Sequence, residues 1–255
     1  MNDADHRGLW LRNYRAAPDA PVRLICFPHA GGSASYFIPL AQALSPSVDV
    51  WAVQYPGRQD RRNEPNLTDL HALASHVFAA LDSLTNRPIA LFGHSMGASV
   101  AFEVCRLLEF DAGIAPEHLF VSGRRAPSRR RTDLAHKLDD EALLADVRKL
   151  NGTDPRIFND DELLRMALPA IRADYQAAET YSPMPGPVSS CPITVLTGAD
   201  DPRTTLAEAE AWTHHTTSPC DVLVYPGGHF FLADQLPEIT GLLIDRLLGH
   251  DRVDP

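Results

Sequence analysis

The chain has 255 residues, of which 44% are hydrophobic and 22% are charged, and its formal net charge is −10. These proportions are typical of a globular protein and exclude a disordered or fibrous chain. The acidic balance argues against general nucleic-acid binding, which needs a basic surface. The polar N-terminus lacks a secretory signal pattern, and no apolar run approaches the roughly 20 residues that span a bilayer. We therefore expect a cytoplasmic protein that does not act on membranes.

Four cysteines stand far apart in the sequence, and they are Cys26, Cys105, Cys191 and Cys220. Disulfide frameworks and zinc sites both use closer or more regular spacings than these. We therefore expect reduced thiols that pack as small apolar side chains, and no metal site.

Short apolar segments rich in β-branched residues predict the strands. Leu9–Tyr14 comes first, and because its side chains alternate in polarity we expect it to be an edge strand. Six further segments are more uniformly apolar: Val22–Phe27, Val48–Val53, Ile89–Phe92, Leu119–Ser122, Ile193–Thr197 and Val222–Tyr225. Runs of this kind suit strands that are covered on both faces, as in a parallel sheet.

Helical periodicity separates these segments. Between Leu70 and Leu84 apolar residues recur every three or four positions, with Thr68 or Asp69 available as the N-cap. A last helix is expected from about Pro237 to Leu248, since proline is favoured in a first helical turn. Strands that alternate with helices indicate an α/β protein with a mostly parallel, doubly wound sheet.

This alternation stops after Ser122, because residues 133–182 contain two helical patterns and no predicted strand. The first pattern should stop at Asn151-Gly152, where the second residue suits a helix C-terminus. The second pattern begins near Asp160 and should bend at Pro169, which removes a backbone donor.

We interpret residues 124–188 as a helical lid subdomain inserted into one domain that covers residues 1–255. Open α/β sheets bind ligands at the carboxyl edge of their strands, and a helical insertion between two strands would cover that edge. The alternative interpretation is that the insertion only adds a further layer to the core.

Gly93-His94-Ser95-Met96-Gly97 matches the G-x-S-x-G nucleophile elbow. The strand Ile89–Phe92 precedes it and a helix is expected from Ala98, which is the context that the motif requires. The glycines leave room around a serine that occupies a strained strand-to-helix turn. The helix N-terminus favours the negative charge that develops during acyl transfer. Motif and context together predict an α/β-hydrolase fold with Ser95 as the nucleophile.

The acid and the histidine of such a site should follow the serine in that order along the chain. Of the 11 histidines, only His229 lies after a late strand and before the terminal helix, so we predict it as the base. The acid should follow the strand Ile193–Thr197, where Asp200 and Asp201 are adjacent. It would orient the imidazole and stabilise its protonated form, but the pattern alone does not separate the two aspartates.

Two backbone amides are expected to form an oxyanion hole. One belongs to Met96, directly after the nucleophile, and the other should come from a loop that follows an early strand. That loop is Pro28–Ala34, and the amide of Ala30 is the predicted donor. Its glycines would let the backbone approach a tetrahedral intermediate. We expect His29 to shape the loop and not to titrate during catalysis.

Four segments together resemble the type II thioesterases, stand-alone editing enzymes that accompany modular polyketide and nonribosomal peptide synthases. The segments are Phe27-Pro28-His29-Ala30-Gly31-Gly32-Ser33, Tyr55-Pro56-Gly57-Arg58, Gly93-His94-Ser95-Met96-Gly97 and Pro226-Gly227-Gly228-His229-Phe230-Phe231. They occur in the family's order along nearly the whole chain. In that family the acid of the triad precedes a proline in the loop after the sixth core strand. The resemblance therefore selects Asp201 over Asp200.

The resemblance implies that the protein hydrolyses acyl thioesters on the phosphopantetheine arms of carrier proteins, through an acyl-serine intermediate and without a cofactor or metal. The implied role is to clear aberrant acyl units from an assembly line. Acyl-loaded carrier proteins would be its partners, and nothing in the sequence demands more than a monomer.

Two other functions are compatible with the same residues. An esterase or acyltransferase of this fold could act on small-molecule esters or thioesters, because triad chemistry does not distinguish an oxoester from a thioester. A more remote alternative is a binding protein that kept the fold without catalysis.

Two further groups of side chains have no assigned role. Five arginines form a run without an acid between Gly123 and Thr132: Arg124, Arg125, Arg129, Arg130 and Arg131. They could steer an acidic carrier protein, but we favour a solvated loop that offsets nearby acids. Four other side chains could line an acyl channel, although we favour core packing for each: Phe158, Met166, Tyr175 and Met184.

Overall fold

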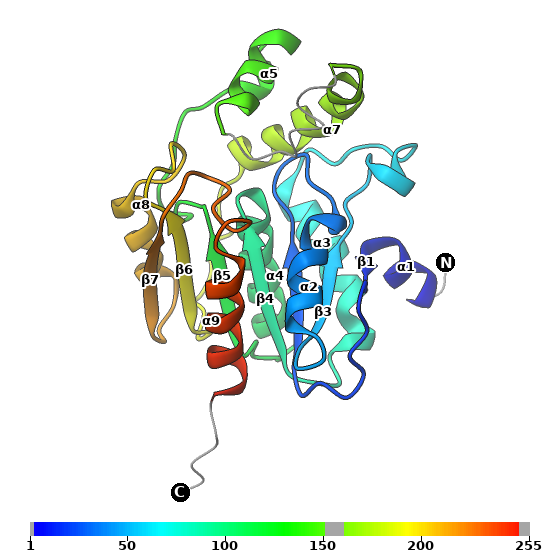
Figure 1. Ribbon diagram of the computed structural model, residues 1–255, viewed down its shortest axis with the longest axis vertical. Coiled ribbons are helices and arrows are strands. Elements are labelled where there is room, and N and C mark those ends of the chain that lie inside the picture. The colour runs from blue at the N-terminus through cyan, green and yellow to red at the C-terminus, as the bar shows by residue number, and fades with distance from the viewer. Residues whose placement is uncertain (1–2, 151–160, 250–255) are drawn as a thin grey trace, which may run out of the picture.

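The computed structural model describes residues 3–150 and 161–249 (Figure 1). Within these ranges the chain forms a seven-stranded sheet in the order β1-β3-β2-β4-β5-β6-β7. The strands are β1 (Leu11–Arg12), β2 (Arg23–Phe27), β3 (Asp49–Val53), β4 (Ile89–His94), β5 (His118–Ser122), β6 (Ile193–Gly198) and β7 (Cys220–Tyr225). Only β1 and β3 pair antiparallel in this sheet, and its other neighbouring strands are parallel. The predicted mostly parallel sheet of the α/β-hydrolase fold is thus confirmed.

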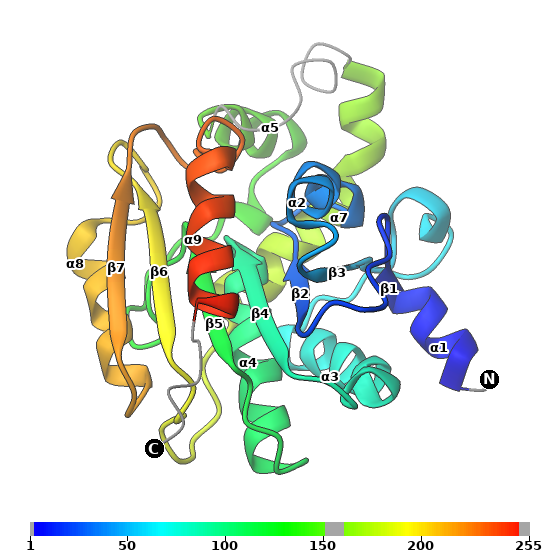
Figure 2. The same ribbon diagram turned by 60° about the horizontal axis from the view of Figure 1, so that its bottom comes forward.

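Helices cover both faces of this sheet (Figure 2). One face packs against α2 (Ile38–Leu44) and α9 (Leu236–Leu248). The other face packs against α3 (Leu70–Leu81) and α4 (Met96–Phe110). Because both faces are covered, β2, β4, β5 and β6 are buried along their whole length, as their apolar sequences predicted. Asp69 is the N-cap of α3, and its carboxylate accepts a hydrogen bond from the Ala72 amide at 2.7 Å.

The predicted edge strand Leu9–Tyr14 is wrong at its start. Residues Leu9 and Trp10 end a helix, α1 (Asp3–Trp10), and β1 contains only two residues. Trp10 is buried and stacks on His76 of α3 at 5.1 Å between ring centroids, with the Arg61 guanidinium 4.4 Å from its ring. Burial of the indole against α3 favours the helix there, and this packing has no signal in local alternation.

Between β5 and β6 the chain forms α5 (Asp140–Arg148) and α7 (Asp161–Thr180), which lie beyond the carboxyl ends of the strands (Figure 1). Asp139 caps α5 through a 2.8 Å hydrogen bond from the Ala142 amide. Helix α7 continues on both sides of Pro169. The predicted stop at Asn151-Gly152 lies outside the described residues, as do the predicted helix start near Asp160 and the side chain of Phe158.

The two inserted helices pack on each other through an apolar cluster distinct from the two clusters of the sheet. Leu143 and Leu144 of α5 meet Leu168 and Ile171 of α7 in this cluster. Helix α8 (Leu206–Glu210) follows β6 and begins with a capping box between Thr205 and Glu208.

The four cysteines are free, and three of them are buried, as the sequence predicted; Cys220 is partly exposed. In the part of the chain that the structure describes, we find no helix with the length and apolarity needed to cross a membrane.

Candidate active site

Ser95 occupies a sharp turn between β4 and α4, with φ at +55° and ψ at −121°. This left-handed backbone conformation is strained for a serine. The flanking glycines are needed because the turn packs against its neighbours. A Cβ atom at Gly93 would lie 2.4 Å from the Ala98 Cα atom, and one at Gly97 would lie 2.0 Å from the Phe27 carbonyl oxygen. The serine side chain is thereby presented at the carboxyl edge of the sheet.

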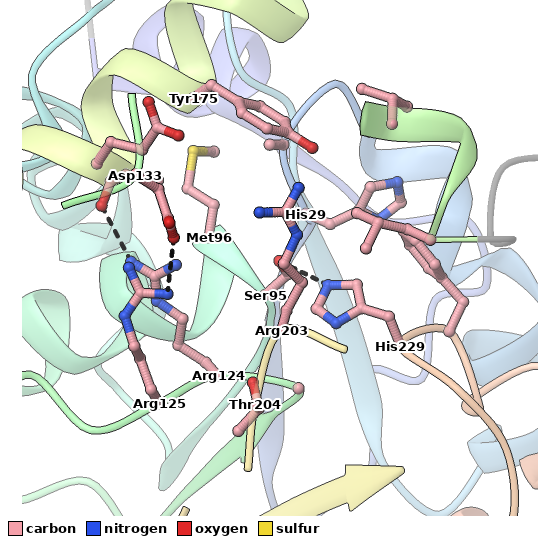
Figure 3. Close-up of a pocket in the computed structure, with 17 residues that line it drawn as sticks. His29, Ser95, Met96, Arg124, Arg125, Asp133, Tyr175, Arg203, Thr204 and His229 are labelled. Atoms are coloured by element: carbon pink, nitrogen blue, oxygen red, sulfur yellow. Dashed lines mark hydrogen bonds and ion pairs between the residues drawn. The ribbon is translucent and has the colours of Figure 1, made fainter. Parts of the chain in front are cut away.

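His229 lies between the serine and an aspartate. Its Nε2 atom is 2.9 Å from the Ser95 Oγ atom (Figure 3). Its Nδ1 atom is 2.9 Å from the Asp201 Oδ2 atom. The Arg203 amide donates a 2.8 Å hydrogen bond to the Asp201 carboxylate. The structure thus brings the three predicted side chains into one hydrogen-bonded chain. Asp200, the alternative acid, is exposed.

The loops that contain the aspartate and the histidine are bound to each other through their backbones. The Asp200 amide donates to the Gly227 carbonyl at 3.0 Å, and the Ala199 amide donates to the Tyr225 carbonyl at 2.8 Å. A Cβ atom at Gly198 would lie 2.2 Å from the Gly228 carbonyl oxygen. Glycine is therefore required at this close approach, which sets the distance between acid and imidazole.

The two predicted oxyanion donors both border the same cavity as Ser95 and His229. Ala30 lies in the loop after β2, and Met96 is the first residue of α4. In the described ranges, neither backbone amide donates to another protein group. The Ala30 loop turns tightly, since the Gly32 amide donates to the His29 carbonyl at 2.9 Å and Gly31 has a φ of +75°.

Two buried histidines, His94 and His29, lie near the imidazole of His229. The His94 ring centroid lies 5.2 Å from that of His229, and the His29 ring packs edge-on against Tyr36 at 4.7 Å. Burial above all, then the nearby charges of His229 and Arg58, lowers the pKa of His29 to about 3. Burial likewise lowers the pKa of His94 well below its usual range. Both rings stay neutral near pH 7, in agreement with a shaping role for His29.

The cavity above Ser95 also contains side chains that the sequence analysis did not assign to a site. Val147, Leu150 and Tyr175 of the insertion line it, as do Arg203 and Thr204. Figure 3 shows Tyr175, Arg203 and Thr204 around the cavity. Arg203 follows Asp201 by two residues, and this proximity is the signal that could have identified it.

Core packing was the favoured prediction for three described residues, and the structure supports it for Tyr175 alone of the three, because this side chain packs against the apolar cluster of α5 and α7. Tyr175 also borders the cavity beside Ser95. Met166 and Met184 are 68% and 58% exposed. Met166 lies on α7 outside the apolar cluster of Leu168 and Ile171, and Met184 lies in the proline-rich segment that returns to the sheet.

The arginine run divides into different environments. Arg131 pairs with Glu208 at 2.7 Å, while Arg129 and Arg130 are exposed, as expected for a solvated loop. For Arg124 that prediction is wrong, because its side chain borders the catalytic cavity and donates to the Ser99 Oγ atom at 2.8 Å. Burial, followed by the charge of Arg125, lowers the pKa of Arg124 to about 9, so this guanidinium remains charged near pH 7.

A buried ion pair next to the Ala30 loop was missed entirely. Arg58 donates to both carboxylate oxygens of Asp174 in α7, at 2.6 and 2.9 Å. The motif Tyr55-Pro56-Gly57-Arg58 contains Arg58 but does not indicate its partner. One feature of the sequence could have identified Asp174. It lies between Ile171 and Tyr175 on the helix, where a charged residue interrupts an otherwise apolar stripe.

Comparisons with known proteins agree with this geometry. A thioesterase domain family model matches residues 22–247. Thioesterase PikA5 of Streptomyces venezuelae is 52% identical over 242 residues, which cover 94% of this chain and 86% of that protein. The probable cadicidin biosynthesis thioesterase of Streptomyces griseus is 47% identical over 251 residues, covering 98% of this chain and 69% of that protein.

A protein of known structure is similar to this chain to about the same extent as PikA5. The type II thioesterase BorB from the borrelidin biosynthetic cluster superposes with a TM-score of 0.89 and 53% identity, covering 94% of this chain and 98% of BorB. The sheet, the nucleophile elbow and these similarities show that the chain belongs to the thioesterase family, among the type II thioesterases of the α/β-hydrolase fold.

Proposed function

We propose that this thioesterase removes acyl groups from the phosphopantetheine arms of carrier proteins in a polyketide or nonribosomal peptide assembly line, and so clears units that block it. The likeness to BorB and to YbtT, a type II thioesterase from a yersiniabactin NRPS/PKS pathway, supports the setting. The observation that supports the chemistry is the chain of hydrogen bonds from Asp201 through His229 to Ser95, which ends in a cavity.

Acylation begins when His229 accepts the proton of Ser95 at its Nε2 atom. The serine oxygen attacks the thioester carbonyl carbon, and the oxygen of the tetrahedral intermediate accepts hydrogen bonds from the amides of Ala30 and Met96. The carbon–sulfur bond then breaks. A thiol is a much stronger acid than an alcohol, so the sulfur leaves readily as a thiolate and afterwards takes the proton from His229.

Deacylation repeats the same steps with water. His229 accepts a proton from water as the water oxygen attacks the acyl-serine, and the same two amides bind the oxyanion. The ester bond to Ser95 breaks, the proton passes from His229 to the serine oxygen, and the carboxylic acid is released. Asp201 holds the imidazole in place and stabilises its positive charge.

We also propose that residues 124–188 act as a lid subdomain within a single domain of residues 1–255. The insertion supplies Val147, Leu150 and Tyr175 to the cavity that contains Ser95. Apolar side chains at this position would contact an acyl chain and exclude water from the thioester before attack.

The exposed arginines are our candidates for carrier recognition. Arg129 and Arg130 line a second cavity, whose walls include Arg124 and Arg125 of the catalytic cavity. Within the described ranges, neither Arg129 nor Arg130 forms an ion pair with a carboxylate. An acidic carrier protein would therefore meet uncompensated positive charge close to the point where its arm must enter.

A monomer in the cytoplasm is the simplest setting for this activity. The free cysteines suit a reducing compartment. Light scattering of the purified protein after size-exclusion chromatography would measure its mass, and a mass of two chains would contradict the monomer.

The test is to offer one acyl group on a carrier protein, on free pantetheine and as an oxoester, and to follow its release by mass spectrometry. We expect the highest kcat/KM for the carrier-bound thioester and loss of release in Ser95→Ala. A preference for the oxoester would overturn the proposed substrate class. A Ser95 that does not react with a fluorophosphonate probe would instead favour the binding protein.

A further inference from the structure

One carboxylate of the inserted helix α7 binds the loop that contains Ala30. The Asp174 Oδ2 atom accepts a hydrogen bond from the Gly31 amide at 2.7 Å, although the two residues are 143 positions apart in the chain. Asp174 is 1% exposed, so the accepting carboxylate is shielded from water, while Gly31 is half-buried. The hydrogen-bonded amide is the one directly after the predicted oxyanion donor.

Arg58 completes the contact from the other side. Its guanidinium donates to both oxygens of Asp174 and, through Nη1, to the Gly32 carbonyl at 3.1 Å. The Nε atom donates to the Pro56 carbonyl at 3.1 Å, which fixes the guanidinium plane. A planar fork of this kind binds a carboxylate through two parallel hydrogen bonds. Gly31 and Gly32 are thus both held by a single buried ion pair.

Helix α7 also packs directly on the loop. A Cβ atom at Gly31 would lie 2.6 Å from the Cγ1 atom of Ile171, one turn before Asp174. Gly31 has a φ of +75°, a conformation that other residues rarely adopt. Helix α7 therefore contributes both a polar and an apolar contact to the loop.

The two predicted oxyanion donors differ in how they are held. The Met96 amide is the first of a 15-residue helix and needs no further support. The Ala30 amide precedes two glycines, which by themselves leave the backbone free to reorient. Oxyanion stabilisation depends on donors that are already oriented before the charge develops. An external anchor at Gly31 and Gly32 supplies that orientation.

A role in fold stability alone does not account for this pair. Burial of two charges costs desolvation energy that their mutual attraction often fails to offset, and well-packed apolar residues commonly stabilise at least as well. The ion pair also orients the loop backbone, which apolar residues would not do. Asp174 accepts a hydrogen bond from one specific amide of the loop, and Arg58 donates a hydrogen bond to one specific carbonyl.

We propose that Arg58 and Asp174 are positioning residues that hold the Ala30 amide in place, so that the oxyanion hole is complete only while α7 contacts the loop. This inference rests on the proposed function, since it takes Ala30 as an oxyanion donor. It makes α7 a component of the catalytic geometry in addition to a cover over the cavity.

The experiment uses Asp174→Asn with Asp49→Asn as its matched control. Asp49 is likewise a buried aspartate paired with an arginine, Arg23, but it lies at the start of β3, at the opposite edge of the sheet from Ser95. For each variant, kcat and KM are measured with a pantetheine thioester, and melting temperatures are recorded. Binding affinities are measured for two inhibitors. The first is a trifluoromethyl ketone, whose carbonyl carbon is attacked by the serine to give an adduct with an oxyanion. The second is a non-hydrolysable thioether, which forms no oxyanion.

For Asp174→Asn we expect kcat to fall about 10- to 100-fold, less than the loss on removing a whole oxyanion donor. Affinity for the ketone should fall by a similar factor, while KM and thioether affinity stay within about threefold of wild type. Asp49→Asn should lower the melting temperature and leave kcat unchanged. Arg58→Lys keeps the positive charge but loses the two parallel hydrogen bonds of the guanidinium. It should therefore lower kcat and ketone affinity in the same way, but by a smaller factor. This variant replaces Asp174→Asn in the test if Asp174→Asn does not fold.

An unchanged kcat in Asp174→Asn and Arg58→Lys would overturn the inference. So would a loss of kcat that leaves ketone affinity intact, or that Asp49→Asn reproduces. Failure of the proposed function is distinguishable, because it would appear in the wild-type protein as a preference for the oxoester or as a Ser95 that does not react with a fluorophosphonate, whatever the behaviour of Asp174.

Discussion

The Nδ1 atom of His229 lies 2.9 Å from one carboxylate oxygen of Asp201 and 3.0 Å from the other, and both side chains are at most 2% exposed. Shielded from water, this carboxylate can hold one orientation and one tautomer of the imidazole. Asp200 precedes it directly but is exposed at the surface. The two aspartates are neighbours in sequence with entirely different environments.

Asp201→Asn should therefore lower kcat by about 10³- to 10⁴-fold, because an amide donates a hydrogen bond to Nδ1 and favours the wrong tautomer. Asp200→Asn, the adjacent control, should keep kcat within about twofold, as is usual for an exposed substitution. Steady-state kinetics with a pantetheine thioester at pH 7.5 measure both, at about 25 °C. Equal losses in the two variants would contradict the assignment of Asp201.

Gly97→Ala should destabilise the protein by about 3 kcal/mol or more, because its methyl group would lie 2.0 Å from the Phe27 carbonyl oxygen. Gly241→Ala is a matched control, for which the free energy of unfolding should change in the opposite direction. Gly241 lies exposed inside α9, and a methyl group there would have no neighbour within 4 Å, so alanine should stabilise the helix by about 0.5–1 kcal/mol. Urea unfolding measures both changes, and stabilisation by Gly97→Ala would refute the packing argument.

The depressed pKa of His29 predicts an acid-sensitive fold. Folded His29 titrates at about 3 and not at its usual 6.5, so between these values the unfolded chain binds a proton that the folded protein excludes. The free energy of unfolding should consequently decrease as pH falls below 6.5, with this residue contributing about 1.4 kcal/mol per pH unit.

In His29→Gln the contribution of this side chain is removed, so unfolding between pH 6.5 and 4.5 should depend less steeply on pH. His94 has a pKa shift in the same direction and keeps part of the dependence in both proteins. His6→Gln, at a partly exposed position of α1, controls for the loss of one histidine. Urea titrations at a series of pH values give the slopes, and a His29→Gln slope equal to that of wild type would refute the prediction.

Loss of both Arg129 and Arg130 should weaken the use of carrier-bound substrate and spare small substrates. We expect the double alanine variant to lower kcat/KM about 10-fold for an acyl-carrier protein at low ionic strength, with less effect at high salt. With a pantetheine thioester it should match wild type. Arg15→Ala/Arg62→Ala removes the same charge from two exposed arginines outside both cavities. If this control lowers carrier-dependent activity equally, net charge and not a docking surface is responsible.

Most of the sheet could be predicted because its strands are buried on both faces. Arg23–Phe27 and Ile193–Gly198 differ from the predicted segments by only one residue at an end, since a run of apolar β-branched residues marks such a strand directly. The prediction of a strand over Leu9–Tyr14 was correct only for Leu11 and Arg12. It was wrong at Leu9 and Trp10 because Trp10 stacks on His76 of α3, which lies about 60 residues further along the chain.

The candidate site was predictable where it depends on chain order. Ser95, His229 and the loop with Ala30 follow motifs in a fixed order, and each stands next to a recognisable strand. Asp201 could be separated from Asp200 only by resemblance, because burial of one side chain and exposure of its neighbour depend on how two loops pack. Arg124 was misjudged for the same reason, because it lies in the loop after β5, and only the packing of that loop places its side chain against Ser99 and the cavity.

By itself the sequence determined the order of strands and helices, the strained serine turn with its two glycines, and the identity of the residues available for acyl transfer. These depend on local sterics and on patterns of apolar residues, which act over a few positions. The tertiary structure alone decided that Asp174 reaches Gly31 and Arg58, and that one aspartate faces His229. Such contacts join segments far apart in the chain, and a buried charge is stable only where folding brings its partner within hydrogen-bonding distance.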